Sequence, residues 1–164
     1  MIMGIFLKNL QKVKVMKPCG MTISSSKETG GTVRIQRLQG HQVLSPLCSL
    51  TGASHFVKHL QFTNWPDHGT PASGDYFIKY VRYVRKSHVT GPMVVHCSAG
   101  VGRTGVFICA DVVFCAIEKN YSFNIMNIVT QMRKQRYGMI QTKEQYHFCY
   151  EIVLQVLQKL LTLE

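Results

Sequence analysis

The chain has 164 residues, of which 46% are hydrophobic and 16% are charged, and its formal net charge is +11. This length suits one soluble domain with its own core, and the longest apolar run, residues 106–117, is interrupted by Asp111 and too short to span a bilayer. The six cysteines include no Cys-x2-Cys pair, so we expect reduced thiols, not a secreted disulfide scaffold, and a cytoplasmic location with the nucleus as the alternative.

Residues 1–50 are predicted to form a basic leader. The first 64 residues contain eight Lys or Arg and one acid, so they carry most of the excess positive charge of the chain. A basic stretch can bind nucleic acid or anionic lipid, but this one has no recognisable binding module. We therefore expect a poorly ordered, solvated arm and no nucleic-acid partner. The main domain is predicted over residues 51–164.

The first predicted element of the main domain is a strand from His55 to Phe62. His55 and His59 have the i, i+4 spacing of zinc ligands on a helix, but this run has the composition of a strand. We therefore expect no metal and no cofactor.

Residues 65–71, Trp-Pro-Asp-His-Gly-Thr-Pro, follow this strand and are called the aspartate loop below. Proline and glycine at both ends indicate a hinged loop that can close over a site. Asp67 on such a loop is a candidate general acid. A lone Pro-Asp pair is also typical of an ordinary turn or a helix N-cap.

An amphipathic helix over residues 73–86 and a short buried strand over residues 92–96 come next. The chain then turns through glycines and enters an apolar helix, so backbone N–H groups converge at a helix N-terminus, where an anion binds well. Cys97 lies at the base of this turn, and Arg103 adds a planar two-pronged donor for phosphate oxygens. These neighbours favour a thiolate. Residues 97–103, the cradle, also contain Ser98, Ala99, Gly100, Val101 and Gly102 as predicted phosphate contacts.

Two neighbours of the cradle have alternative interpretations. The Thr104 hydroxyl either donates a hydrogen bond to the leaving thiolate of Cys97 or satisfies backbone at the start of a helix. His96 either orients the cradle through its ring nitrogens and favours the thiolate, or is a core histidine with its hydrogen bonds satisfied.

Three helices are predicted in the remainder. Residues 105–119 are apolar nearly all round, which indicates a central helix. Ser122 is the predicted cap of a second helix, and Thr142 begins a final one. Thr142 and Gln145 have the spacing of a capping box. The alternation of strands and helices predicts an α/β architecture.

Three of these segments resemble those of the protein tyrosine phosphatases. Residues 96–105 match the signature His-Cys-x5-Arg-Ser/Thr-Gly, and the aspartate loop resembles the family's WPD loop. Residues 138–145, Gly-Met-Ile-Gln-Thr-Lys-Glu-Gln, resemble its Q loop. The match is specific because a reactive nucleophile, an anion-binding turn and the strand-to-helix context coincide.

The resemblance implies a role for each matching residue. Cys97 is the implied nucleophile, Arg103 binds phosphate, and Asp67 is the general acid and contacts substrate. Gln141 and Gln145 are implied to orient the water that hydrolyses the cysteinyl-phosphate and to fix the substrate. For Gln145 the capping box is an equal explanation. Arg133 and Arg136 match arginines that lie near the site in the family. A second explanation for both is that a basic helix end complements the helix dipole.

The implied fold is a mixed sheet flanked by helices. The resemblance runs from about residue 52 and implies an earlier strand at residues 32–35. Residues 1–50 contain no Lys-Asn-Arg-Tyr loop of the kind that selects phosphotyrosine in the family. We therefore expect a sheet that is incomplete on its N-terminal side, with low stability and weak activity. The implied function is hydrolysis of phosphotyrosine in proteins. The alternatives are a weak or inactive fragment that binds phosphotyrosine or a partner, and a dual-specificity phosphatase.

Overall fold

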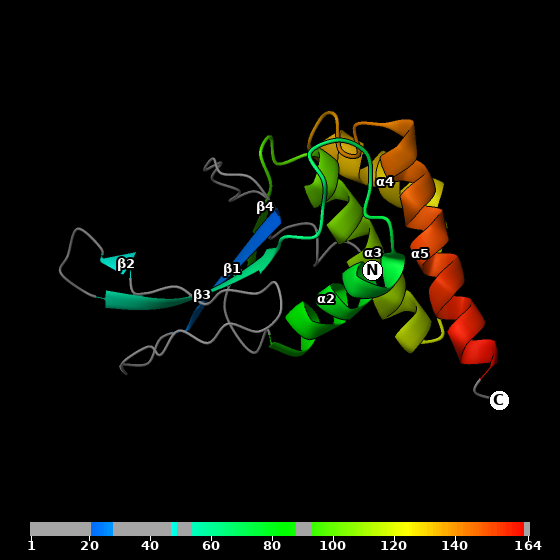
Figure 1. The fold of residues 1–164 in the computed structure, drawn as a ribbon, viewed down its shortest axis with the longest axis horizontal. Helices are drawn as coiled ribbons and strands as arrows, with labels where there is room; N and C mark the ends of the chain where they lie inside the picture. Colours follow the sequence, from blue (N-terminus) through cyan, green and yellow to red (C-terminus); the bar gives the residue numbers. More distant parts are fainter. Residues whose placement is uncertain (1–20, 28–46, 49–53, 88–92, 163–164) are drawn as a thin grey trace.

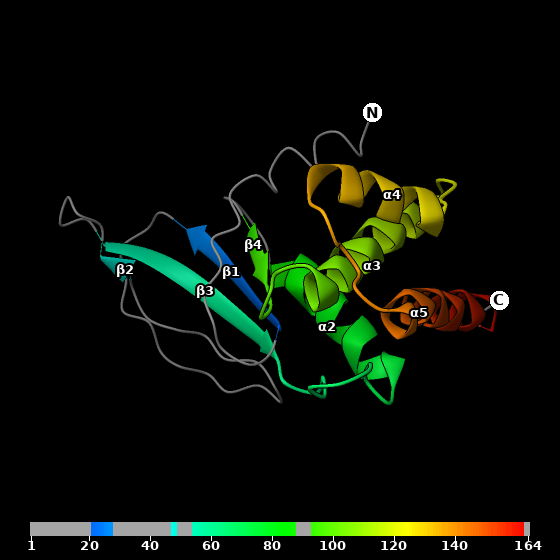
Figure 2. The ribbon, with the colours of Figure 1, turned by 90° about the horizontal axis from the view of Figure 1, so that it is seen from above.

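The computed structural model describes residues 21–27, 47–48, 54–87 and 93–162 (Figure 1). The elements in chain order are β1 (Met21–Lys27), β2 (Leu47–Cys48), β3 (Ser54–Phe62), α2 (Gly74–Ser87), β4 (Met93–His96), α3 (Gly102–Glu118), α4 (Ile125–Gln135) and α5 (Lys143–Leu161). These four helices lie to one side of the sheet in both views (Figures 1 and 2). The described part thus combines helices and strands, as the sequence predicts.

The described strands form one sheet in the order β2-β3-β1-β4. All three described pairings are antiparallel, and the mixed sheet that the resemblance implies stays a prediction. Because β3 and β4 are both antiparallel to β1, they run parallel to each other on either side of it. Thr22 lies opposite Gln61 of β3 and also opposite His96 of β4. The aspartate loop and the cradle therefore leave the sheet at the same edge.

The strands β1 and β2 lie within the predicted leader, and β1 occupies an interior position in the sheet. Neither strand is predicted from the sequence. The sequence of β1, MTISSSK, alternates apolar and polar residues only over its first four positions and then continues as a run of serines, which is a short signal for a strand. Backbone pairing on both sides defines this strand. The strand predicted at residues 32–35 lies outside the described residues, and the domain boundary at residue 50 stays a prediction.

The helices agree with the sequence apart from one cap. Ser122 is predicted to cap α4, but the cap is Asn124, whose side-chain oxygen accepts a hydrogen bond from the Asn127 N–H at 2.9 Å. Both residues are of types that cap helices, and they are only two positions apart, so composition does not separate them. Thr142 caps α5 as predicted and accepts from the Gln145 N–H at 3.2 Å.

The apolar helix α3 is the central helix of the described part, as predicted, and it packs against α2, α4 and α5 (Figure 2). The buried Tyr80 on α2 donates its hydroxyl to the Leu60 carbonyl of β3 at 3.1 Å, and burial raises the pKa of this phenol. Arg85 of α2 donates to Asp111 of α3 at 2.7 Å. None of the described helices is both long and apolar enough to cross a bilayer.

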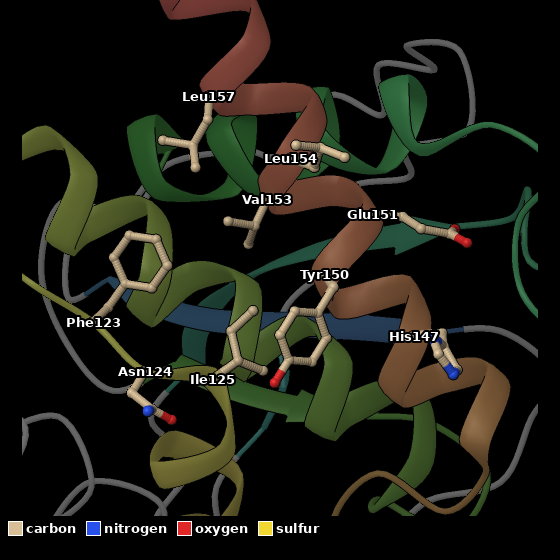
Figure 3. A pocket seen from close by; sticks show the side chains of 9 residues that line it. All are labelled: Phe123, Asn124, Ile125, His147, Tyr150, Glu151, Val153, Leu154 and Leu157. Carbon is tan, nitrogen blue, oxygen red and sulfur yellow. The ribbon is translucent and has the colours of Figure 1, made fainter.

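A groove of about 560 Å³ opens between α5 and the segment that leads into α4 (Figure 3). Its lining is mostly apolar and consists of Phe123, Asn124, Ile125, His147, Tyr150, Glu151, Val153, Leu154 and Leu157. None of the site residues predicted from the sequence lines this groove.

Candidate active site

The cradle connects the end of β4 to the first turn of α3. Gly100 has a φ of +71°, a left-handed conformation that glycine adopts without steric cost. The Gly105 N–H donates to the Val101 carbonyl at 3.0 Å, which closes the first turn of α3. Val101 is the N-cap and supplies no side-chain hydrogen bond, in contrast to the caps of α4 and α5. The first N–H groups of α3 are therefore placed to bind an anion.

Cys97 is 4% exposed at the base of this turn. The buried Thr104 hydroxyl donates a hydrogen bond to the Cys97 sulfur at 3.2 Å. Of the two interpretations of Thr104, this contact supports the one in which it interacts with the sulfur.

Arg103 brings the aspartate loop to the cradle. Its Nη2 donates to the Pro66 carbonyl at 2.8 Å and lies 3.9 Å from Asp67 Oδ1. Its guanidinium carbon lies 5.9 Å from the centroid of the Trp65 ring, within the range of a cation–π interaction. The arginine, the candidate acid and the nucleophile of the sequence motifs therefore belong to one site.

The aspartate loop has a buried base and an exposed tip. Trp65 is 5% exposed, and its ring packs edge-on against Phe77 at 5.4 Å and Phe148 at 5.7 Å. The Trp65 Nε1 donates to the Gly69 carbonyl at 3.0 Å, which ties the loop back to its base. The Asp67 side chain is 76% exposed.

The two glutamines lie against the start of α3. A Cβ atom on Gly102 would meet Gln141 Oε1 at 2.7 Å and both amide atoms of Gln145 at 3.1 Å, so only glycine leaves room for them. Gln145 Oε1 accepts from the Gln141 N–H at 3.0 Å. The capping box is thus only half formed, because the Gln145 side chain bonds to Gln141 and not to Thr142. Gln145 has a structural role and also lies beside the cradle.

His96 is 9% exposed at the end of β4. Burial lowers the pKa of this imidazole below its usual value, and a hydrogen bond with the Cys97 backbone opposes the shift in part. No described residue is a hydrogen-bond partner of its Nδ1. The interpretation of His96 as a core histidine with all its hydrogen bonds satisfied therefore has no support among the described residues.

Both arginines near the end of α4 contact the site region. Arg136 Nη2 donates to the Ala99 carbonyl of the cradle at 3.3 Å. Arg133 donates to two carbonyls of residues 138–142, called the glutamine loop below. A general complement to the helix dipole does not account for these specific contacts.

Sequence reasoning missed the residues that join the glutamine loop to the cradle. The Val101 carbonyl accepts a second hydrogen bond, from the Ile140 N–H at 3.1 Å. A Cβ atom on Gly105 would meet the Ile140 nitrogen at 2.7 Å. The only sequence signal was the glycine after Arg103-Thr104, which permits this approach. Among the described residues, no group of three His, Cys, Asp or Glu is placed to hold a metal ion.

Comparison with known proteins agrees with this arrangement. The family model described as "Protein-tyrosine phosphatase" matches residues 8–155, a range that includes β1. Tyrosine-protein phosphatase non-receptor type 20 of Rattus norvegicus is 86% identical over 113 residues, 69% of this chain and 27% of the relative. The Homo sapiens protein of that name is 80% identical over 114 residues, 70% of this chain and 27% of the relative.

A more distant relative covers more of the chain. Tyrosine-protein phosphatase non-receptor type 13 of Homo sapiens is 42% identical over 141 residues, 85% of this chain and 6% of the relative. The chain spans about a quarter of the length of the type 20 relatives. The family match extends over most of the sequence and includes both the cradle and the two loops beside it. This chain belongs to the protein-tyrosine phosphatase family.

Proposed function

We propose that this chain hydrolyses phosphotyrosine in proteins through a cysteinyl-phosphate intermediate. The observation that carries the proposal is the position of the Cys97 sulfur beside a helix N-terminus without a side-chain cap, with Arg103 linking this cradle to the Asp67 loop. Family membership supports the same chemistry.

In the first step, the Cys97 thiolate attacks phosphorus. The S–P bond forms as the bond from phosphorus to the tyrosine oxygen breaks, and Asp67 gives its proton to that oxygen. The N–H groups of the cradle and the Arg103 guanidinium bind the other phosphate oxygens. The peptide leaves with a neutral tyrosine, and Asp67 is left as a carboxylate.

In the second step, a water molecule attacks the phosphocysteine. The new O–P bond forms as the S–P bond breaks, and the proton of the water returns to Asp67, which now acts as the base. Gln141 orients the water, and the Thr104 hydroxyl stabilises the departing thiolate. Inorganic phosphate leaves, and Cys97 and Asp67 are restored to their starting protonation states.

The proposed substrates are phosphotyrosine proteins of the cytoplasm. The tryptophan-anchored aspartate loop and the two glutamines favour a tyrosine-specific enzyme over a dual-specificity one. The relatives at 80% identity or more are named non-receptor tyrosine-protein phosphatases, which supports the proposed tyrosine specificity and the proposed cytoplasmic substrates.

The test measures phosphate release from a phosphotyrosine peptide and from a matched phosphoserine peptide. The wild-type chain is expected to act on the first alone, and Cys97→Ser is expected to abolish release because serine is a far weaker nucleophile. Cys115→Ser, at a half-buried cysteine of α3, is the matched control and keeps its activity. Phosphate release by Cys97→Ser at the wild-type rate would refute the mechanism. Tight peptide binding by the wild type without release would favour a binding module.

A further inference from the structure

Arg133 makes two hydrogen bonds to consecutive backbone carbonyls of the glutamine loop. Its Nε donates to the Met139 carbonyl at 2.9 Å, and its Nη2 donates to the Ile140 carbonyl at 2.8 Å. A guanidinium presents these donors in a fixed plane, so the two bonds together restrict the rotation of the peptide unit between them. A single ammonium group has no comparable fixed geometry.

The residue held in this way has an unfavourable backbone conformation. Ile140 has a φ of +61°, and the other described non-glycine residue with a positive φ is Asn120. Asparagine tolerates this left-handed region, whereas a β-branched residue there is a true outlier. Such a conformation persists only where the surroundings determine it. Here they include the 1% exposure of Ile140, its N–H bond to Val101 and the two bonds from Arg133.

Gln141 follows Ile140 directly, so the backbone angles of Ile140 set the direction in which Gln141 leaves the loop. With Ile140 left-handed, the Gln141 side chain lies against Gly102 at the start of α3. In an ordinary extended or helical conformation, the chain would turn away from this position. The conformation of Ile140 is thus the link between Arg133 and the cradle.

We propose that Arg133 is a positioning residue for hydrolysis of the cysteinyl-phosphate. It holds Ile140 left-handed and so keeps Gln141 where it orients the attacking water. This inference rests on the proposed function, and it assigns Arg133 to the second step. The described contacts support an effect on the second step alone. Arg133 bonds to the glutamine loop, whereas Arg136, three residues further along the chain, bonds to the cradle itself.

The experiment compares Arg133→Met with wild type in rapid-quench kinetics on an aryl phosphate. Release of the aryl group in the first turnover is expected to stay within about twofold of wild type. Hydrolysis of the phosphoenzyme is expected to slow by about 10- to 100-fold, as for a misplaced orienting group. The phosphocysteine form therefore accumulates. Lys134→Met removes the same charge from the same turn of α4 at an exposed side chain and is expected to leave both rates unchanged.

Arg133→Lys provides a second test that keeps the charge and the aliphatic stem. It is expected to slow phosphoenzyme hydrolysis by a smaller factor, about 3- to 10-fold, because one ammonium replaces the planar pair of donors. If Arg133→Met does not unfold cooperatively, Arg133→Lys alone tests the proposal. Wild-type hydrolysis in Arg133→Lys, or equal slowing of both steps in either variant, would overturn the inference and leave the proposed function intact. Absence of aryl release from wild type would overturn both.

Discussion

The two loops that meet the cradle are held in different ways. The aspartate loop is anchored at its base by Trp65, and Arg103 bonds to it at Pro66, while the Asp67 side chain is 76% exposed. The glutamine loop is buried at its centre, since Met139 is 3% exposed and Ile140 is 1% exposed, whereas Gln141 and Thr142 are exposed. Its backbone is bonded to both α3 and α4.

This difference matches the two tasks in the proposed mechanism. A general acid on a lid has to withdraw so that a protein substrate can enter, and loops that move are weakly held by the rest of the protein. A group that orients water gains from being fixed before the reaction, because positioning is then achieved at no further entropic cost. We infer that the aspartate loop moves during the cycle and the glutamine loop does not.

The largest expected effect on turnover comes from a change in the aspartate loop. Asp67→Ala removes the proton donor for the leaving phenolate, so turnover of a phosphotyrosine peptide is expected to fall by about 10²- to 10⁴-fold. Peptide affinity is expected to be retained, since the cradle and Arg103 are untouched, and the variant then traps its substrate. Steady-state kinetics and a peptide-binding titration measure the two quantities.

His68→Ala is the matched control, because His68 is the exposed neighbour of Asp67 on the same loop. It is expected to turn over substrate at nearly the wild-type rate. Unchanged turnover in Asp67→Ala would remove Asp67 from the mechanism. An equal loss in both variants would show that loop structure, not a proton donor, was disturbed.

The second prediction concerns a substitution that displaces the glutamine loop. Gly105→Ala places a Cβ 2.7 Å from the Ile140 nitrogen, so the backbone of the glutamine loop has to shift. Overpacking of this kind is expected to lower the free energy of unfolding by about 1–3 kcal/mol. Turnover is expected to fall as well, because Gln141 moves with Ile140. Urea denaturation and steady-state kinetics provide the measurements.

Gly69→Ala is the corresponding change in the aspartate loop. Gly69 has a φ of +77° but nothing within 4 Å of an added Cβ, so only the backbone conformation of the new alanine is strained. The expected cost is about 1 kcal/mol. If Gly105→Ala were as stable as wild type, the glutamine loop would not be the rigid element inferred here.

The cradle was largely predictable because its residues are contiguous in the sequence. Cys97 and Thr104, which are seven positions apart, are joined by the short turn between β4 and α3 and lie in hydrogen-bond contact. The helices were predictable for a similar reason, since apolar periodicity is a local property. The choice between Ser122 and Asn124 as a cap depends on the backbone angles of each residue, which composition does not report.

Two features depend on contacts between distant segments and were not predictable. The parallel run of β3 and β4, which brings the aspartate loop to the cradle, requires β1 between them. The serine-rich β1 alternates apolar and polar residues only over its first four positions. The bracing of Ile140 requires Arg133, Val101 and Gly105 to converge from separate elements. Neither has a sequence pattern of its own.

The smallest expected effect is the pH dependence of stability that arises from His96, just before the cradle. Burial lowers the pKa of His96, so the folded protein binds this proton less readily than the unfolded chain. Above the ordinary value of 6.5 both states are neutral at this residue, and the stability is complete. As the pH falls below 6.5, the unfolded chain takes up the proton first, and stability declines until the folded pKa is passed.

For one proton the slope is at most about 1.4 kcal/mol per pH unit. Urea denaturation at several pH values between about 7 and 5 measures it, above the range in which Asp75 is protonated, because Lys159 lowers the pKa of that carboxyl from 3.8. His96→Gln is expected to reduce the slope. An identical slope in wild type and His96→Gln would mean that this histidine is protonated as readily in the folded protein as in the unfolded chain.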